Sequence, residues 1–142
     1  MQKILVATDG SRGGNRAVIA AAQLAMATDA TLLILTIGDN IPSTELRRLA
    51  RTEGGVGEAL ELISNHILDQ AKMRAKQVGV SKVKLQAGWG DAAEVIIETA
   101  RREKADVIIV GRRGRGRLAG LLLGSVSQKV VALAPCTVIV VP

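Results

Sequence analysis

The chain alternates short, almost continuous apolar runs with longer segments in which apolar residues recur every three or four positions. The runs predict strands at residues 3–8, 31–37, 107–110 and 136–141. The first three of these runs are apolar on both faces, which is typical of buried strands in a parallel sheet. Residues 82–87 instead alternate polar and apolar side chains, which predicts an edge strand with one face in water.

The segments between the runs have the spacing of helices that pack one face against a sheet. We expect four such helices: from the turn at residues 9–14 to about Thr28, over residues 57–78, from Asp91 to about Glu103, and from Ser125 to near Ala134. Gly79 is expected to end the second helix as a C-cap, and Asp91 with Glu94 resembles a capping box at the start of the third.

Residues 38–56 are polar and rich in turn formers. They predict a short helix at residues 43–51 after Pro42, followed by a stop at Gly54-Gly55. We assign no chemistry to this segment.

Strands that alternate with helices predict a single doubly wound α/β domain over residues 1–142. Parallel neighbours need crossover connections, which are almost always right-handed, so helices should cover both faces of a five-stranded, parallel, Rossmann-like sheet. An order of 3-2-1-4-5 would place Asp9, after the first strand, beside Gly111, after the fourth. In sheets of this kind ligands bind beyond the carboxyl ends of the strands, where the winding reverses.

Composition argues against several classes of function. Trp89 is the only aromatic residue, so stacking of nucleic-acid bases on a row of rings is not available and we expect no nucleic-acid partner. Cys136 is the only cysteine, which leaves no intramolecular disulfide and no zinc-binding spacing and fits a reducing compartment. No apolar run approaches the roughly 18 residues of a membrane span, and residues 1–3 lead directly into a strand. We therefore expect a cytoplasmic protein without a membrane partner.

The net charge of +6 is unevenly distributed. No Asp or Glu follows Asp106, whereas the basic residues after it carry five positive charges: Arg112, Arg113, Arg115, Arg117 and Lys129. A charge run is usually a solvated surface that serves solubility. Here the arginines are interleaved with glycines after a buried strand, which favours attraction of phosphate.

The glycines of this loop predict a backbone site for an anion. They stand at Gly111, Gly114, Gly116, Gly120 and Gly124, where backbone amides can approach a ligand closely. Ser125 and Ser127 follow at the start of the last helix, whose unpaired N–H groups and dipole favour negative charge. Phosphate is the natural candidate.

Two common phosphate motifs fit the loop poorly. A P-loop pattern runs from Gly111 to Gly116, but Arg117 and Leu118 stand where the motif needs lysine and a hydroxyl, which argues against a P-loop NTPase. Gly114, Gly116 and Ala119 match G-x-G-x-x-A, but no acidic residue follows at about twenty positions. An NAD enzyme is therefore a lesser alternative.

A third pattern fits without gaps: Gly111, two residues, Gly114, nine residues, and then Gly124-Ser125. It resembles the ATP-binding signature of the universal stress protein family, G-x2-G-x9-G-S/T. The resemblance extends over the whole chain, from the first strand with its Thr8-Asp9-Gly10-Ser11 turn to the closing residues 135–142. It implies a doubly wound fold that binds ATP or a related adenine nucleotide, usually as a homodimer paired through the last strand, residues 136–141.

The resemblance also implies roles for individual residues. Thr8 and Asp9 would line the adenosine, Ile37 would contact the base, and Val110 with Gly111 would run beside the ribose. The phosphates, with which Mg²⁺ could enter, would be held by the loop and the helix start: Gly114, Arg115, Gly124, Ser125, Val126 and Ser127. The chemistry agrees, because a carboxylate can accept a hydrogen bond from a ribose hydroxyl or an adenine amine, and glycine lets backbone amides reach a triphosphate.

Several residues also have a structural interpretation. Asp9 has a second interpretation as a cap of the first helix, which we rank behind its ligand role, and residues 121–123 are expected to be core rather than a lid or a dimer contact. His66 stands in a helix among polar neighbours, which favours a solvated side chain over a catalytic one. Cys136 is expected to be a small core residue, and Trp89 to anchor packing rather than to support a base.

Catalysis finds little support in the sequence. It shows no Ser-His-Asp set, no pair of carboxylates at the expected site and no metal cluster, so slow ATP hydrolysis through positioning alone is the most that we expect. Three interpretations remain: a nucleotide-binding regulatory or stress-response module, a slow ATP-hydrolysing or nucleotide-transferring enzyme, and a structural dimerisation module that binds no nucleotide. We favour the first, in which occupancy alters a dimer or partner surface.

Overall fold

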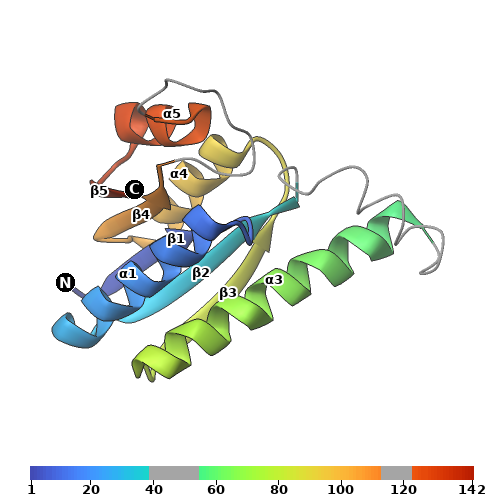
Figure 1. Ribbon diagram of the computed structural model, residues 1–142. Helices are drawn as coiled ribbons and strands as arrows, with labels where there is room; N and C mark the ends of the chain where they lie inside the picture. The colour runs from blue at the N-terminus through green and yellow to red at the C-terminus, as the bar shows by residue number, and fades with distance from the viewer. Residues whose placement is uncertain (39–54, 113–122) are drawn as a thin grey trace.

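Five parallel strands form the central sheet of the computed structural model, which describes residues 1–38, 55–112 and 123–142. The strands are β1 (Lys3–Ala7), β2 (Thr31–Ile37), β3 (Val83–Gly88), β4 (Val107–Gly111) and β5 (Thr137–Val141). They lie in the order β3-β2-β1-β4-β5 (Figure 1), which confirms the order 3-2-1-4-5 predicted from the sequence. Every neighbouring pair is parallel.

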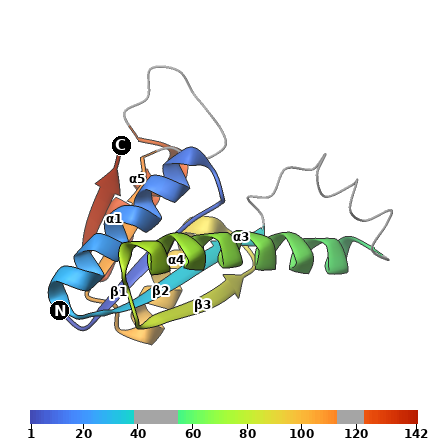
Figure 2. The same ribbon diagram turned by 60° about the horizontal axis from the view of Figure 1, so that its bottom comes forward.

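Helices cover both faces of this sheet. One face is covered by α1 (Arg12–Thr28) and α3 (Val56–Val78), and the other by α4 (Ala92–Glu103) and α5 (Ser125–Leu133) (Figures 1 and 2). Successive residues of a strand point to opposite faces, so β1 contributes Ile4 and Val6 to the core under α1 and α3, and Leu5 to the core under α4 and α5. The predicted doubly wound α/β class is confirmed.

Burial follows the sequence pattern in β2 and β3 but not in β5, whose apolar residues are half-buried or exposed. β2 is buried from Leu32 onward, as its continuous apolar run predicts, whereas Lys84 and Leu85 of β3 are exposed. β3 is an edge strand, as its alternation predicts, and β5 is the other edge. The first strand ends at Ala7 rather than at Thr8, although the Thr8 N–H still donates to the Leu35 carbonyl at 2.9 Å.

The helices begin and end close to the predicted residues. Ser11 Oγ caps α1 by accepting from the Gly14 N–H at 3.1 Å, and Asp91 Oδ2 caps α4 by accepting from the Glu94 N–H at 3.0 Å. Gly79 ends α3 in the left-handed conformation with φ of 119°, which glycine adopts without strain. The short helix predicted at residues 43–51 lies outside the described residues.

The longest helix of the described chain is α3, with 23 residues. Charged residues such as Glu58, Glu61 and Lys72 stand along its exposed side. Neither α3 nor any other helix in the described ranges is long and apolar enough to cross a membrane.

Candidate functional site

The two neighbours of β1 extend beyond its carboxyl end. The register between β1 and β2 ends at Ala7–Leu35, but β2 continues to Ile37. Likewise, the register between β1 and β4 ends at Val6–Ile109, but β4 continues to Gly111. The helix after β1 covers one face and the helix after β4 covers the other, so the winding reverses here, at the position where such sheets bind ligands.

We call this region the strand-end site. It comprises the residues at the ends of β1, β2 and β4 and at the start of α5: Thr8, Asp9, Ile37, Val110, Gly111, Gly124, Ser125, Val126 and Ser127. The structure thus brings together nine of the residues that the resemblance implied. The other two, Gly114 and Arg115, lie outside the described residues.

The turn between β1 and α1 is held tightly at this site. Thr8 Oγ1 accepts from the Gly10 N–H at 3.2 Å, and Asp9 Oδ1 accepts from the Ser11 N–H at 2.9 Å. Thr8 is buried and Asp9 is half-buried. Asp9 therefore orders the turn that precedes α1, and its contact with a ribose or an adenine amine stays a prediction.

Gly14, in the first turn of α1, lies against this turn and is not singled out by the sequence pattern. A Cβ at Gly14 would lie 2.5 Å from Thr8 Oγ1 and 3.0 Å from Asp9 Oδ1. Only glycine lets α1 approach the end of β1 this closely. The signal in the sequence was the glycine pair that follows the capping Ser11.

Ile37 offers its backbone rather than its side chain to the strand-end site. Its side chain is 2% exposed and lies in the core under α4 and α5, as does that of Val110. The Leu35 carbonyl points toward β1, because it accepts from Thr8. The N–H and C=O of Ile37, two residues later, point the same way but lie beyond the last residue of β1. Ile37 therefore presents one donor and one acceptor.

Hydrogen bonds join the two ends of the glycine-rich loop. The Arg112 carbonyl accepts from the Gly124 N–H at 2.8 Å and from the Ser127 hydroxyl at 3.0 Å. The Arg112 N–H donates to the Val141 carbonyl in β5 at 2.7 Å. These bonds hold the first turn of α5 beside the end of β4.

The N-terminus of α5 carries backbone donors without helical acceptors. Gly124 is the N-cap, and the Gln128 N–H makes the first helical hydrogen bond, to the Gly124 carbonyl at 3.0 Å. The N–H groups of Ser125, Val126 and Ser127 precede this bond and have no acceptor within the helix. Together with the positive end of the helix dipole they form a local site for an anion.

The two serines of this turn differ in what they can offer. Ser125 is exposed, so its hydroxyl is accessible. Ser127 is 3% exposed, and its hydroxyl lies 3.0 Å from the carbonyls of both Arg112 and Gly124. A contribution of Ser127 to phosphate binding would therefore come from its N–H.

Lys129 belongs to an ion-pair cluster between α4 and α5. Its Nζ lies 3.3 Å from Asp91 Oδ2 and 3.4 Å from Glu94 Oε1. These hydrogen bonds, first that to Asp91 and then that to Glu94, raise the pKa of Lys129. The five positive charges counted after Asp106 therefore include one that is paired with α4. Arg113, Arg115 and Arg117 lie outside the described residues.

His66 and Cys136, the histidine and the cysteine of the chain, are not among the residues of the strand-end site. His66 is exposed on α3. Cys136 is half-buried against the core under α4 and α5, and burial raises the pKa of its thiol. Within the ranges that the structure describes, no group of three or more His, Cys, Asp or Glu side chains could hold a metal ion.

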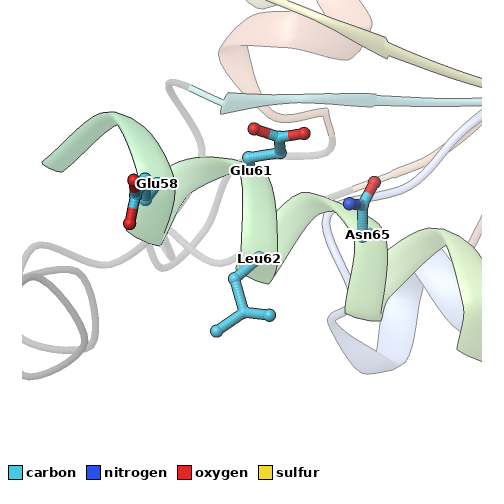
Figure 3. Close-up of a pocket in the computed structure, with 4 residues that line it drawn as sticks. All are labelled: Glu58, Glu61, Leu62 and Asn65. Atoms are coloured by element: carbon cyan, nitrogen blue, oxygen red, sulfur yellow. The ribbon is translucent and has the colours of Figure 1, made fainter. Parts of the chain in front are cut away.

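A pocket on α3 lies apart from the strand-end site. It is lined by Glu58, Glu61, Leu62 and Asn65, all on one helix (Figure 3). Figure 3 shows Glu61 and Asn65 on one side of the helix and Leu62 on the other. Its two carboxylates would repel a phosphate, so we place the candidate site at the strand ends.

Comparison with known proteins gives consistent matches over the whole chain. The sequence model described as "Universal stress protein family" matches residues 1–142. A Thermus aquaticus protein named "Universal stress protein in QAH/OAS sulfhydrylase 3'region" is 36% identical over 143 residues, which cover 97% of this chain and 96% of that protein.

Solved structures of similar proteins share the fold. The universal stress protein UspA from Lactobacillus plantarum superposes with a TM-score of 0.80 at 25% identity, over 99% of this chain and 97% of that one. A universal stress protein in complex with cAMP superposes with a TM-score of 0.74 at 32% identity, over 99% of this chain and 96% of that one.

Proposed function

This chain belongs to the universal stress protein family, and from that premise we propose that residues 1–142 form one domain that binds ATP or a related adenine nucleotide in the strand-end site. The observation that carries the proposal is the start of α5. Its three N–H groups without helical acceptors stand beside the end of β4, at the point where the winding reverses.

The backbone groups of the site complement the parts of an adenine nucleotide. Phosphates would bind the N–H groups of Ser125, Val126 and Ser127, with the loop residues Gly114 and Arg115 completing the contact and Mg²⁺ accompanying the nucleotide. The base would meet Ile37, whose donor and acceptor match the ring nitrogen and amino group of adenine. The ribose would then lie between Asp9 and Gly111.

A similar protein supports adenine as the base. The universal stress protein that was solved in complex with cAMP is 32% identical to this chain. Cyclic AMP carries a single phosphate, so the preference for a triphosphate rests on the α5 N-terminus and on the arginines of the loop.

We further propose a cytoplasmic regulatory or stress-response role in which two copies pair through β5. β5 is an edge strand, and Ile139 on it is 38% exposed. An exposed apolar edge strand is prone to pair with another chain, and a second copy would cover it symmetrically. We assign no catalytic residue, and slow ATP hydrolysis is the most that we expect.

Calorimetric titration of the nucleotide-stripped protein with ATP, ADP and AMP tests the binding site when it is combined with Ser125→Asp. Aspartate at the first residue of α5 suits the helix dipole, so α5 stays stable, but its carboxylate repels phosphate. We expect ATP affinity to fall at least about tenfold, which corresponds to about 1.4 kcal/mol of repulsion between the new carboxylate and the phosphates. The melting temperature should be unchanged or raised.

Gly57→Asp is the matched control. It adds the same charge to the first turn of another helix, α3, at an exposed position. ATP affinity should stay near the wild-type value in this variant. Equal affinities in the wild-type protein and in Ser125→Asp would contradict a phosphate site at α5, and no heat with any nucleotide would contradict nucleotide binding altogether.

A further inference from the structure

Trp89 stands at the carboxyl end of β3, next to the strand-end site. It follows Gly88, which pairs with Ile37 in the register between β2 and β3. Its indole packs directly over Gly38, where a Cβ would overlap the six-membered ring. The indole therefore packs on the residue that follows Ile37. The N–H and C=O of Ile37 face the strand-end site.

The glycines on either side of Trp89 fix the path of this loop. A Cβ at Gly88 would lie 2.6 Å from Val95 Cγ1 of α4. Gly90 has φ of 114°, a conformation that glycine adopts and other residues rarely do. Side chains are thus disfavoured at Gly38, Gly88 and Gly90, and the backbone of Trp89 is held between α4 and the end of β2.

About half of the surface of Trp89 is left uncovered. Trp89 is 52% exposed, although it is the only aromatic residue of the chain and packs on buried Gly38. The packing role predicted from the sequence accounts for the contact with Gly38 but not for this exposure, since an anchor stabilises in proportion to the apolar area it buries. A fixed, half-exposed aromatic ring is suited to contact another planar ring.

We propose that the exposed side of Trp89 forms a wall for the base of the bound nucleotide. The assignment rests on the proposed function, because it requires a nucleotide whose base reaches Ile37. Ile37 would recognise the hydrogen-bonding edge of the base, whereas Trp89 contacts its ring and responds to ring size. The site should therefore prefer purine over pyrimidine nucleotides through Trp89, and adenine over guanine through Ile37.

Fluorescence gives a direct readout, because the chain has no Tyr or Phe and all tryptophan emission comes from Trp89. We expect ATP and AMP to change the emission, and inorganic tripolyphosphate, which lacks a base, to leave it unchanged. By calorimetry, Trp89→Leu should lose about tenfold in ATP affinity, in the range measured for loss of a stacking side chain. Trp89→Phe should recover most of this loss.

Leu85→Ala supplies the control for apolar surface on the same strand. Leu85 lies in the middle of β3, opposite Ile34, and is 36% exposed. ATP affinity should match the wild-type value in this variant. Circular dichroism and melting temperature establish that each variant is folded.

Three results test this assignment, and together they separate it from the proposed function. ATP binding that is equally tight in the wild-type protein and in Trp89→Leu would overturn the role of Trp89 and leave nucleotide binding intact. A loss in Trp89→Phe as large as that in Trp89→Leu would likewise overturn contact between rings. No heat from the folded wild-type protein with any nucleotide would overturn the proposed function and this assignment with it.

Discussion

Gly14 sets how closely α1 approaches the end of β1. Because a Cβ there would lie 2.5 Å from Thr8 Oγ1, Gly14→Ala must shift the turn that carries Thr8 and Asp9. We expect a loss of about 1–3 kcal/mol in the free energy of unfolding, as for other overpacked sites. Urea denaturation measures this loss, and calorimetry should show weaker ATP binding as well.

Gly57→Ala is the matched control for Gly14→Ala. Gly57 also stands in the first turn of a helix, but a Cβ there meets no atom within 4 Å. This variant should be about 0.5–1 kcal/mol more stable than the wild-type protein, because alanine is the better helix former. Equal effects of the two substitutions would contradict the steric role of Gly14.

Asp106 ties the N-terminal segment to the start of β4 and makes stability depend on pH. Its Oδ2 accepts from the N–H groups of Lys3 at 2.9 Å and Gln2 at 2.7 Å, and these bonds hold its pKa below the ordinary value. Because the folded pKa is depressed, the stabilisation is present above the ordinary pKa of about 4 and is lost as pH falls through the folded pKa.

Asp106→Asn should therefore lower the free energy of unfolding near pH 7 and flatten its decline below about pH 4. Urea unfolding over this pH range measures both effects. A variant whose pH profile parallels that of the wild-type protein would contradict the role of this carboxyl.

Some side chains in and beside the strand-end site could not be placed from the sequence. Ser127 was expected to hold phosphate, but its hydroxyl lies against the Arg112 carbonyl, fifteen residues away, because the loop ends meet. The sequence groups Lys129 with the arginines of the loop, but it pairs with Asp91, the N-cap of α4, thirty-eight residues away. Contacts over such separations depend on how helices pack, which local pattern does not encode.

The cap of α1 positions the turn of the strand-end site. Ser11 Oγ accepts from the Gly14 N–H at 3.1 Å. Ser11→Ala removes this acceptor and should cost about 1 kcal/mol of unfolding free energy, whereas Ser11→Asn, which retains a side-chain acceptor, should cost little. Thermal denaturation of both variants measures the difference. An equal loss in the two variants would contradict the capping role.

The elements were predictable because each has a strong local signal. β2 was predicted at its observed bounds, since residues 31–37 are continuously apolar or β-branched, and β3 was predicted as an edge strand from its alternation. The strand order followed from the right-handed crossovers and from the two glycine-bearing turns that must meet. Residues 38–56 carry no comparable period, so the sequence assigned them only a short helix and no function.

The proposed dimer depends on the edge strand β5. Ile139→Lys places a charge on this edge, and we expect light scattering to report a mass near that of one chain, 14.9 kDa, in place of twice that mass. Leu85→Lys is the matched control, because it introduces the same charge at a residue of similar exposure on β3, the opposite edge. Wild-type protein at the mass of one chain would contradict the dimer, and loss of the dimer in both variants would contradict pairing through β5.

Backbone amide NMR would locate the bound nucleotide residue by residue. Titration with ATP should shift the amide resonances of Ser125, Val126 and Ser127 together with that of Ile37. Inorganic tripolyphosphate should shift only the first three, and adenosine only the last. ATP binding that leaves all four unchanged and instead shifts Glu58, Glu61 and Asn65 at the α3 pocket would contradict the strand-end site.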